Sequence, residues 1–81
     1  MSKQFLSALG LNVKNRRIQQ KLTQLELCHA AGIDLSYISR IERGQVNVSI
    51  EGLLKVSNAL KCNARDLLPD NDVPDSDETD K

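Results

Sequence analysis

The fold of this chain is decided by the stretch TQLELCHAAGIDLSYISRIERG, residues 23–44 of 81. Thr23 is a good helix N-cap, and Glu26 three residues later completes a capping box. Leu27, Cys28 and Ala31 then lie on one side of a helix that ends near Ala31. Gly32 takes a positive φ angle at little cost and ends that helix. The first half of the stretch therefore predicts a short helix followed by a glycine turn.

The second half of the stretch, residues 34–43, predicts a helix with a polar face that has nothing to bury. Asp34 is its N-cap and Gly44 lies at its end. Ile38 and Ile41 mark the inner face. At 100° per residue the other side is polar and consists of Ser36, Arg40 and Arg43, with Ser39 at the flank. Two short helices around a glycine turn form the helix-turn-helix pattern.

A longer helix is predicted before this stretch, over residues 5–20. Leu6, Leu9 and Val13 repeat at spacings of three and four, and Arg17 continues the same stripe. Arg17 is therefore expected to point inward. Gly10 interrupts the helix at a cost of about 1 kcal/mol.

Two helices are predicted after the stretch. Ser49 caps the first, whose 3–4 stripe consists of Ile50, Leu53, Leu54, Ser57 and Leu60. Asn63 caps a final short helix, residues 64–68, and Pro69 follows. With no convincing strand and almost no aromatic residues, the chain is expected to be an all-α, compact five-helix domain.

The zero net charge hides two oppositely charged segments. Residues 1–68 carry ten Lys/Arg and five Asp/Glu, so +10 − 5 = +5, and residues 69–81 carry one Lys and six acids, so +1 − 6 = −5. We expect a domain over residues 1–69 and an acidic, disordered tail over residues 70–81. The tail is interpreted first as a solubilising end; alternatively it masks the basic face or binds a protein partner.

The composition excludes several classes of protein. Two cysteines and one histidine supply neither a disulfide framework nor the four ligands of a zinc site, and no apolar run approaches about 20 residues. There is no nucleophile–base pair or phosphate loop, so neither an enzyme nor a cofactor is expected. The apolar run after Met1 is too short for a signal peptide, and we expect a cytoplasmic protein with reduced thiols.

Two segments, NRRIQQKLTQLELCHAAGIDLSYISRIERG and SIEGLLKVSNAL, carry a resemblance to a known family. The run from about Leu9 to Leu68 resembles the helix-turn-helix domain of lambdoid-phage repressors and Cro proteins, the Cro/C1-type (XRE) regulators. The resemblance implies a lambda-repressor-like fold whose third helix, residues 34–43, enters the DNA major groove. Lys61 departs from the pattern, because glycine is usual after the fourth helix.

The resemblance also assigns roles to individual residues. It implies base contacts from Leu35, Ser36, Tyr37, Ser39 and Arg40, although Tyr37 has an alternative role at the edge of the core. It implies phosphate contacts from Gln24, Arg43, Gln45 and Asn47. It implies a structural salt bridge between Arg17 and Glu42 that ties the first helix to the third.

These assignments predict a sequence-specific transcriptional regulator that binds a palindromic DNA operator as a homodimer. The dimer face is expected on the fifth helix and the end of the fourth, with Leu67, Leu68, Val56 and Phe5 as candidates. A restriction–modification controller protein and an antitoxin of the same fold remain open. So does a different class, a helical adaptor that contacts proteins and not DNA.

Overall fold

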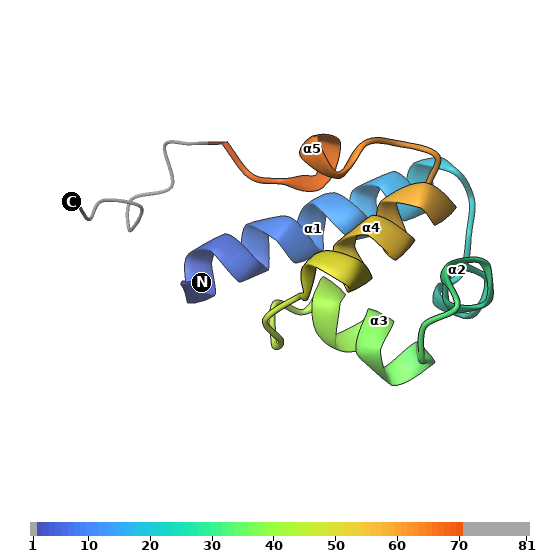
Figure 1. The fold of residues 1–81 in the computed structure, drawn as a ribbon, viewed down its shortest axis with the longest axis horizontal. Coiled ribbons are helices and arrows are strands. Elements are labelled where there is room, and N and C mark those ends of the chain that lie inside the picture. The colour runs from blue at the N-terminus through green and yellow to red at the C-terminus, as the bar shows by residue number, and fades with distance from the viewer. Residues whose placement is uncertain (1, 71–81) are drawn as a thin grey trace.

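A computed structural model describes residues 2–70, and within that range it contains five helices and no strand (Figure 1). The helices are α1 (Lys3–Gln19), α2 (Gln24–Ala31), α3 (Leu35–Glu42), α4 (Ile50–Ala59) and α5 (Ala64–Leu67). The expected all-α architecture is therefore confirmed. The predicted disordered tail falls, apart from Asp70, outside the described residues.

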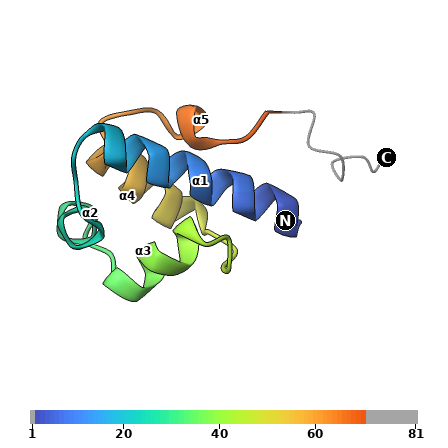
Figure 2. The same cartoon turned by 180° about the vertical axis from the view of Figure 1, so that it is seen from behind.

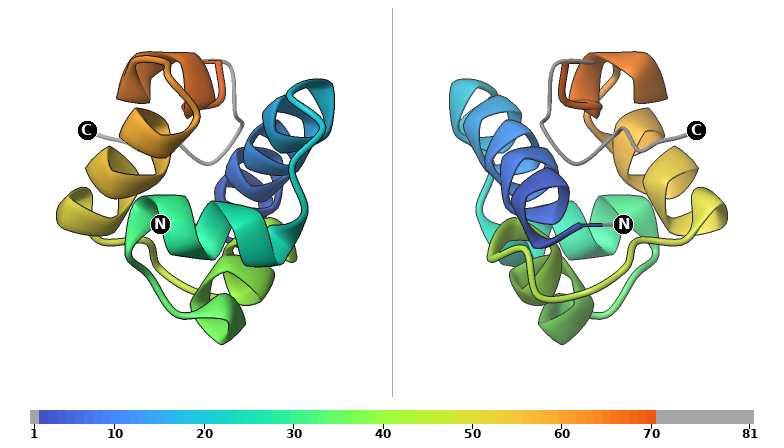
Figure 3. Two further views of the ribbon diagram at one scale, coloured as in Figure 1. Left: turned by 90° about the vertical axis from the view of Figure 1, so that its right-hand side faces the viewer. Right: turned by 90° about the vertical axis from the view of Figure 1, so that its left-hand side faces the viewer.

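The helices enclose a single core. α1 packs against α3 and α5, α2 packs against α3 and α4, and α4 packs against α5. Figure 3 shows α1 and α4 on two sides of the molecule, with α2 and α3 between them at one end. α5 lies at the opposite end from α3 in both Figure 1 and its reverse view, Figure 2. This arrangement leaves α3 at the edge of the molecule.

Most of the predicted inward stripes fill the core. Leu9, Val13 and Leu27 are at most 1% exposed, and Ile38 and Ile41 of α3 pack beside them. Burying side chains of this size stabilises the fold by about 1.5–3 kcal/mol each. Leu and Ile residues from all five helices thus supply the apolar volume that the scarce aromatic residues do not.

The helix ends follow the predicted capping residues, although Asp34 and Asn63 make no side-chain capping hydrogen bond. The Thr23 hydroxyl accepts from the Glu26 backbone N–H at 3.0 Å, and the Glu26 carboxylate accepts from the Thr23 backbone N–H at 2.8 Å. Gly32 has φ +68° and ends α2. Asp34 occupies the N-cap position of α3, but its side chain makes no capping hydrogen bond.

Two lysines adopt the left-handed conformation that glycine usually takes after a helix. Lys61 has φ +58° and Lys21 has φ +60°. In each case the next N–H turns back to the helix: Cys62 donates to the Ser57 carbonyl, and Leu22 donates to the Arg17 carbonyl. The turn after α4 therefore forms without glycine, at a conformational cost of about 1–2 kcal/mol.

Gly10 has a role that the sequence analysis missed. It is buried where α1 crosses the end of α3, and a Cβ atom there would lie 2.1 Å from the Ile41 carbonyl oxygen. A second glycine, Gly44, packs against the backbone of Ser7 at the start of α1. The two glycines allow the backbones of α1 and the end of α3 to approach closely.

The expected dimer face is wrong at two positions. Val56 is 1% exposed and Leu67 is 0% exposed, and both belong to the core. Val56 lies three residues after Leu53, so a helix must place both on the same inner face. Leu67 is buried because α5 packs against both α1 and α4. The apolar side chains that α4 exposes are instead Ile50, at 73%, and Leu54, at 49%, although both belong to the predicted stripe.

Candidate nucleic-acid interface

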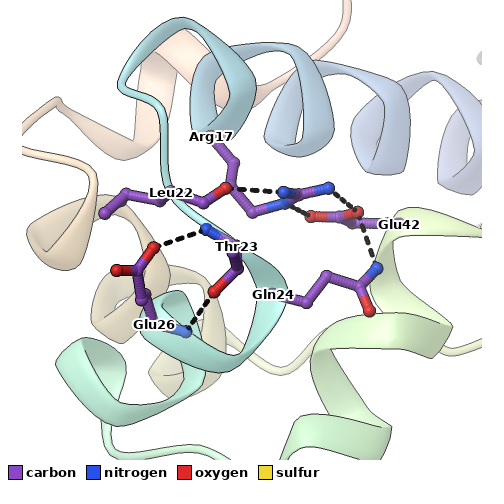
Figure 4. A network of polar contacts seen from close by, with 6 residues as sticks. All are labelled: Arg17, Leu22, Thr23, Gln24, Glu26 and Glu42. Atoms are coloured by element: carbon purple, nitrogen blue, oxygen red, sulfur yellow. Dashed lines mark hydrogen bonds and ion pairs between the residues drawn. The ribbon is translucent and has the colours of Figure 1, made fainter.

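A buried ion pair joins α1 to the end of α3. Arg17 Nε lies 2.6 Å from Glu42 Oε2, and Arg17 Nη2 lies 3.1 Å from Glu42 Oε1. The two side chains are only 11% and 3% exposed. Arg17 Nη1 also donates to the Leu22 carbonyl at 2.7 Å, as Figure 4 shows. The structure thus contains the salt bridge that the family resemblance implies, in the two-pronged geometry that favours arginine.

Gln24 extends this network to α2. Its Nε2 donates to Glu42 Oε1 at 2.9 Å, and the residue is half-buried (Figure 4). Gln24 is the first residue of α2, where unpaired backbone N–H groups and the helix dipole favour an anion. The residue predicted to contact phosphate therefore also makes an internal contact, which the sequence analysis did not foresee.

The outer face of α3 is exposed, as the polar pattern predicts. Ser36 and Arg40 are exposed, Leu35 is 44% exposed, and Ser39 at the flank is half-buried. Arg40 Nε donates to the Ser36 carbonyl at 3.4 Å. This face therefore offers serine hydroxyls and a guanidinium group on one short helix.

Tyr37 differs from the other predicted base-contact residues. It is half-buried and packs against the core. Its hydroxyl accepts from the Ser49 backbone N–H at 3.3 Å, beside Gly52 in the first turn of α4. Tyr37 thus lies at the seam between α3 and α4, at the edge of the polar face and not at its centre.

The loop after α3 carries the other predicted phosphate-contact residues. Arg43, Gln45 and Asn47 are all exposed, and Arg43 Nε donates to Gln45 Oε1 at 3.1 Å. Together with Gln24 at the start of α2, these residues lie before and after α3 in the chain. The candidate interface consists of the outer face of α3, the first turn of α2 and this loop.

The exposed charges of the interface balance. Arg40 and Arg43 are exposed cations, and the exposed anions are Asp34 at the start of α3 and Glu26 in the first turn of α2. Glu42 adds little negative charge, because Arg17 pairs with it at 2.6 Å. Neutral donors such as Gln24, Ser36 and Gln45 therefore supply a large share of the polar groups available to DNA.

Other chemistry finds little support in the described part of the chain. Residues 2–70 contain no group of His, Cys, Asp and Glu side chains arranged for a metal ion. None of the helices there has the length and apolar character needed to cross a bilayer. Burial raises the pKa of the Cys62 thiol, an effect that Arg16 opposes and Asp66 reinforces, so the reactive thiolate is disfavoured.

Comparisons with known proteins agree with this geometry. A protein-family model described as helix-turn-helix matches residues 13–67. The control protein C.BamHI of Bacillus amyloliquefaciens is 37% identical over 60 residues, which cover 73% of this chain and 74% of that protein. The immunity repressor protein of Bacillus phage phi105 is 38% identical over 52 residues, which cover 64% of this chain but only 36% of the repressor.

Solved structures show the same arrangement of helices. The restriction–modification controller protein C.AhdI from Aeromonas hydrophila superposes with a TM-score of 0.76 at 36% identity, covering 78% of this chain and 96% of that one. The hypothetical transcription factor NHTF from Neisseria has a TM-score of 0.76 at 30% identity, covering 89% of this chain and 84% of that one. Fold and sequence therefore agree over most of the described residues.

Proposed function

The chain belongs to the helix-turn-helix family of Cro/C1-type DNA-binding transcription regulators, and on that premise we propose that it binds a palindromic operator as a homodimer. Its relatives are regulators and control proteins, not enzymes. The observation that carries the proposal is the exposed polar face of α3, whose opposite side is held in the core by Ile38 and Ile41. We assign this protein to the cytoplasm, where its DNA would be.

In the proposed complex α3 lies in the major groove, which is about 12 Å wide and accepts one helix. Arg40 forks onto the O6 and N7 atoms of guanine, a contact worth about 1–3 kcal/mol of discrimination. Ser36 and Ser39 donate or accept and specify weakly, and Leu35 contacts a thymine methyl group. Tyr37 reaches DNA only at the flank of the helix, since its hydroxyl is engaged near Ser49.

Phosphate contacts on both sides of α3 hold the helix in register. Gln24 and the first N–H groups of α2 take one phosphate, and Arg43, Gln45 and Asn47 take phosphates at the other side. All of these residues are exposed or half-buried, which supports the assignment. Such contacts fix orientation without reading sequence.

We place the dimer face on the outer side of α4. Ile50 and Leu54 are one turn apart and expose 73% and 49% of their surface. Glu51 and Lys55 beside them form an ion pair at 3.4 Å within the helix. A two-fold axis across α4 would place Ile50 and Leu54 against the same residues of a second copy. Glu51 of each copy would then face Lys55 of the other, which is the reciprocal pairing of an isologous contact.

Selection of bound sequences from a random duplex library tests the proposal directly. The expected result is a palindromic consensus whose half-sites are centred about 10 base pairs apart, or a multiple of that spacing. A consensus without symmetry would refute the homodimer on a palindrome. Failure to bind any duplex at low salt would refute DNA binding and favour the protein-binding adaptor.

A restriction–modification controller protein is the second candidate. The observation that favours it is sequence similarity: C.BamHI, at 37% identity, is a control protein, and C.AhdI, at 36% identity, is a restriction–modification controller protein. If the candidate is right, the selected consensus will occur upstream of neighbouring methyltransferase and endonuclease genes. A consensus found only among phage genes, or beside a toxin gene, would exclude it.

A further inference from the structure

We propose that Glu42 is a positioning residue for DNA binding: it holds the Gln24 amide so that one N–H stays on the protein and the other faces a DNA phosphate. This inference rests on the proposed function. Under this proposal the buried ion pair both joins α1 to α3 and keeps Glu42 in place to position Gln24.

The donor count of the amide permits this arrangement. A glutamine side chain has two N–H donors on one nitrogen. One of them is used on Glu42 Oε1, 2.9 Å away, and Gln24 is only half-buried. Within residues 2–70 this is the only hydrogen bond of the amide, so the second N–H remains for a ligand at the first residue of α2, where the helix terminus favours an anion.

The charge of Glu42 is balanced inside the protein, so this carboxylate can position the Gln24 amide without repelling a DNA phosphate. A free carboxylate next to a phosphate would repel it. Glu42 is 3% exposed and accepts two hydrogen bonds from Arg17, so its charge is balanced inside the protein. The network thus supplies a neutral donor whose side chain is already fixed in the free protein. The entropy cost of fixing the Gln24 side chain is therefore not added when DNA binds.

A matched pair of variants isolates the acceptor at position 42. Arg17→Met/Glu42→Gln and Arg17→Met/Glu42→Met both lack the ion pair, and they differ in whether residue 42 keeps an oxygen that can accept from Gln24. Binding of the full chain to its selected operator is measured by fluorescence anisotropy, with circular dichroism as the check on folding. The Gln variant is expected to bind about 5- to 10-fold more tightly than the Met variant.

The same pair in a Gln24→Met background provides the control. If Glu42 acts through Gln24, the difference between the two variants disappears there. Equal affinities in the Gln24 background, or a difference that persists without Gln24, would overturn the inference while leaving DNA binding intact. Failure of the parent chain to bind any duplex would overturn the proposed function, and the inference with it.

Two further measurements do not depend on the stability of those variants. Gln24→Met should weaken binding at every salt concentration by the same factor, because a neutral donor releases no counterion; Arg43→Met should reduce the salt slope by about one. In the parent chain, one side-chain NH2 proton of Gln24 should be protected from exchange before DNA is added, and the other should shift on binding. Equally fast exchange of both protons in the free protein would refute the contact with Glu42.

Discussion

Replacing Gly10 by alanine should destabilise the domain, although helix propensity alone favours the opposite result. Alanine in a helix interior is about 1 kcal/mol more favourable than glycine. The added Cβ, however, would lie 2.1 Å from the Ile41 carbonyl oxygen and 2.8 Å from that of Glu42. A normal carbon–oxygen contact is about 3.3 Å, so α1 and α3 would have to separate by about 3.3 − 2.1 = 1.2 Å.

The magnitude follows from setting the two effects against each other. Overpacking a close-packed interior costs about 1–3 kcal/mol, and the upper end applies here because the opposing atoms are backbone. After the gain of about 1 kcal/mol in propensity, the free energy of unfolding should fall by about 2 kcal/mol. For a domain of this size that is a substantial part of a total of about 4–12 kcal/mol.

Urea unfolding followed by circular dichroism measures the effect. With a slope of about 1 kcal/mol per molar urea, the midpoint should fall by about 2 M. Gly52→Ala is the matched control, since its Cβ would meet side-chain atoms of Ser49 and Tyr37 at 3.1 Å, and side chains can move. Its effect should stay within about 1 kcal/mol. A Gly10→Ala protein as stable as the parent would refute the close approach of α1 and α3.

Three other predictions concern binding and assembly. Arg40→Ala should relax the base preference at one position of each half-site, whereas Gln45→Ala should weaken all sequences alike; binding selections that gave the reverse pattern would contradict both assignments. Leu54→Glu should convert the dimer to a monomer in analytical ultracentrifugation, while Leu11→Glu, at a residue of similar exposure on α1, should not; a dimer that survives the first change would exclude the α4 face. Deleting residues 70–81 should leave the circular dichroism spectrum and the affinity for random duplex unchanged, and a gain in affinity would show that the tail masks the basic face.

The parts of the fold that the sequence predicts are those set by neighbouring residues. The capping box at Thr23, the glycine turn at Gly32 and the 3–4 stripes of α1 and α3 depend on groups within a few positions of one another. The predicted inward stripe of α4 was partly wrong, because local spacing does not show which side of a helix other elements will cover. Ile50 and Leu54 fit the spacing, but no other part of residues 2–70 covers that side of the helix, and Val56 takes the inner position.

Contacts between distant segments could not be predicted from the residues alone. The close approach that Gly10 allows depends on where α3 crosses α1, more than 30 positions later. The hydrogen bond from Gln24 to Glu42 joins residues 18 positions apart. The Arg17–Glu42 pair was foreseen only because the family resemblance supplied it. The inward stripe explained Arg17, but no local pattern identified its partner.

The structure holds the two ends of α3 in different ways. Its C-terminal end is fixed by three contacts: Gly10 against the Ile41 carbonyl, the Glu42 ion pair, and Gly44 against Ser7. Its N-terminal half keeps only Ile38 and, at the seam, Tyr37 in contact with the core. If the proposed base contacts are right, substitutions at the exposed Leu35 and Ser36 should change the DNA sequence recognised at little cost in stability, since the residues that hold the helix are elsewhere.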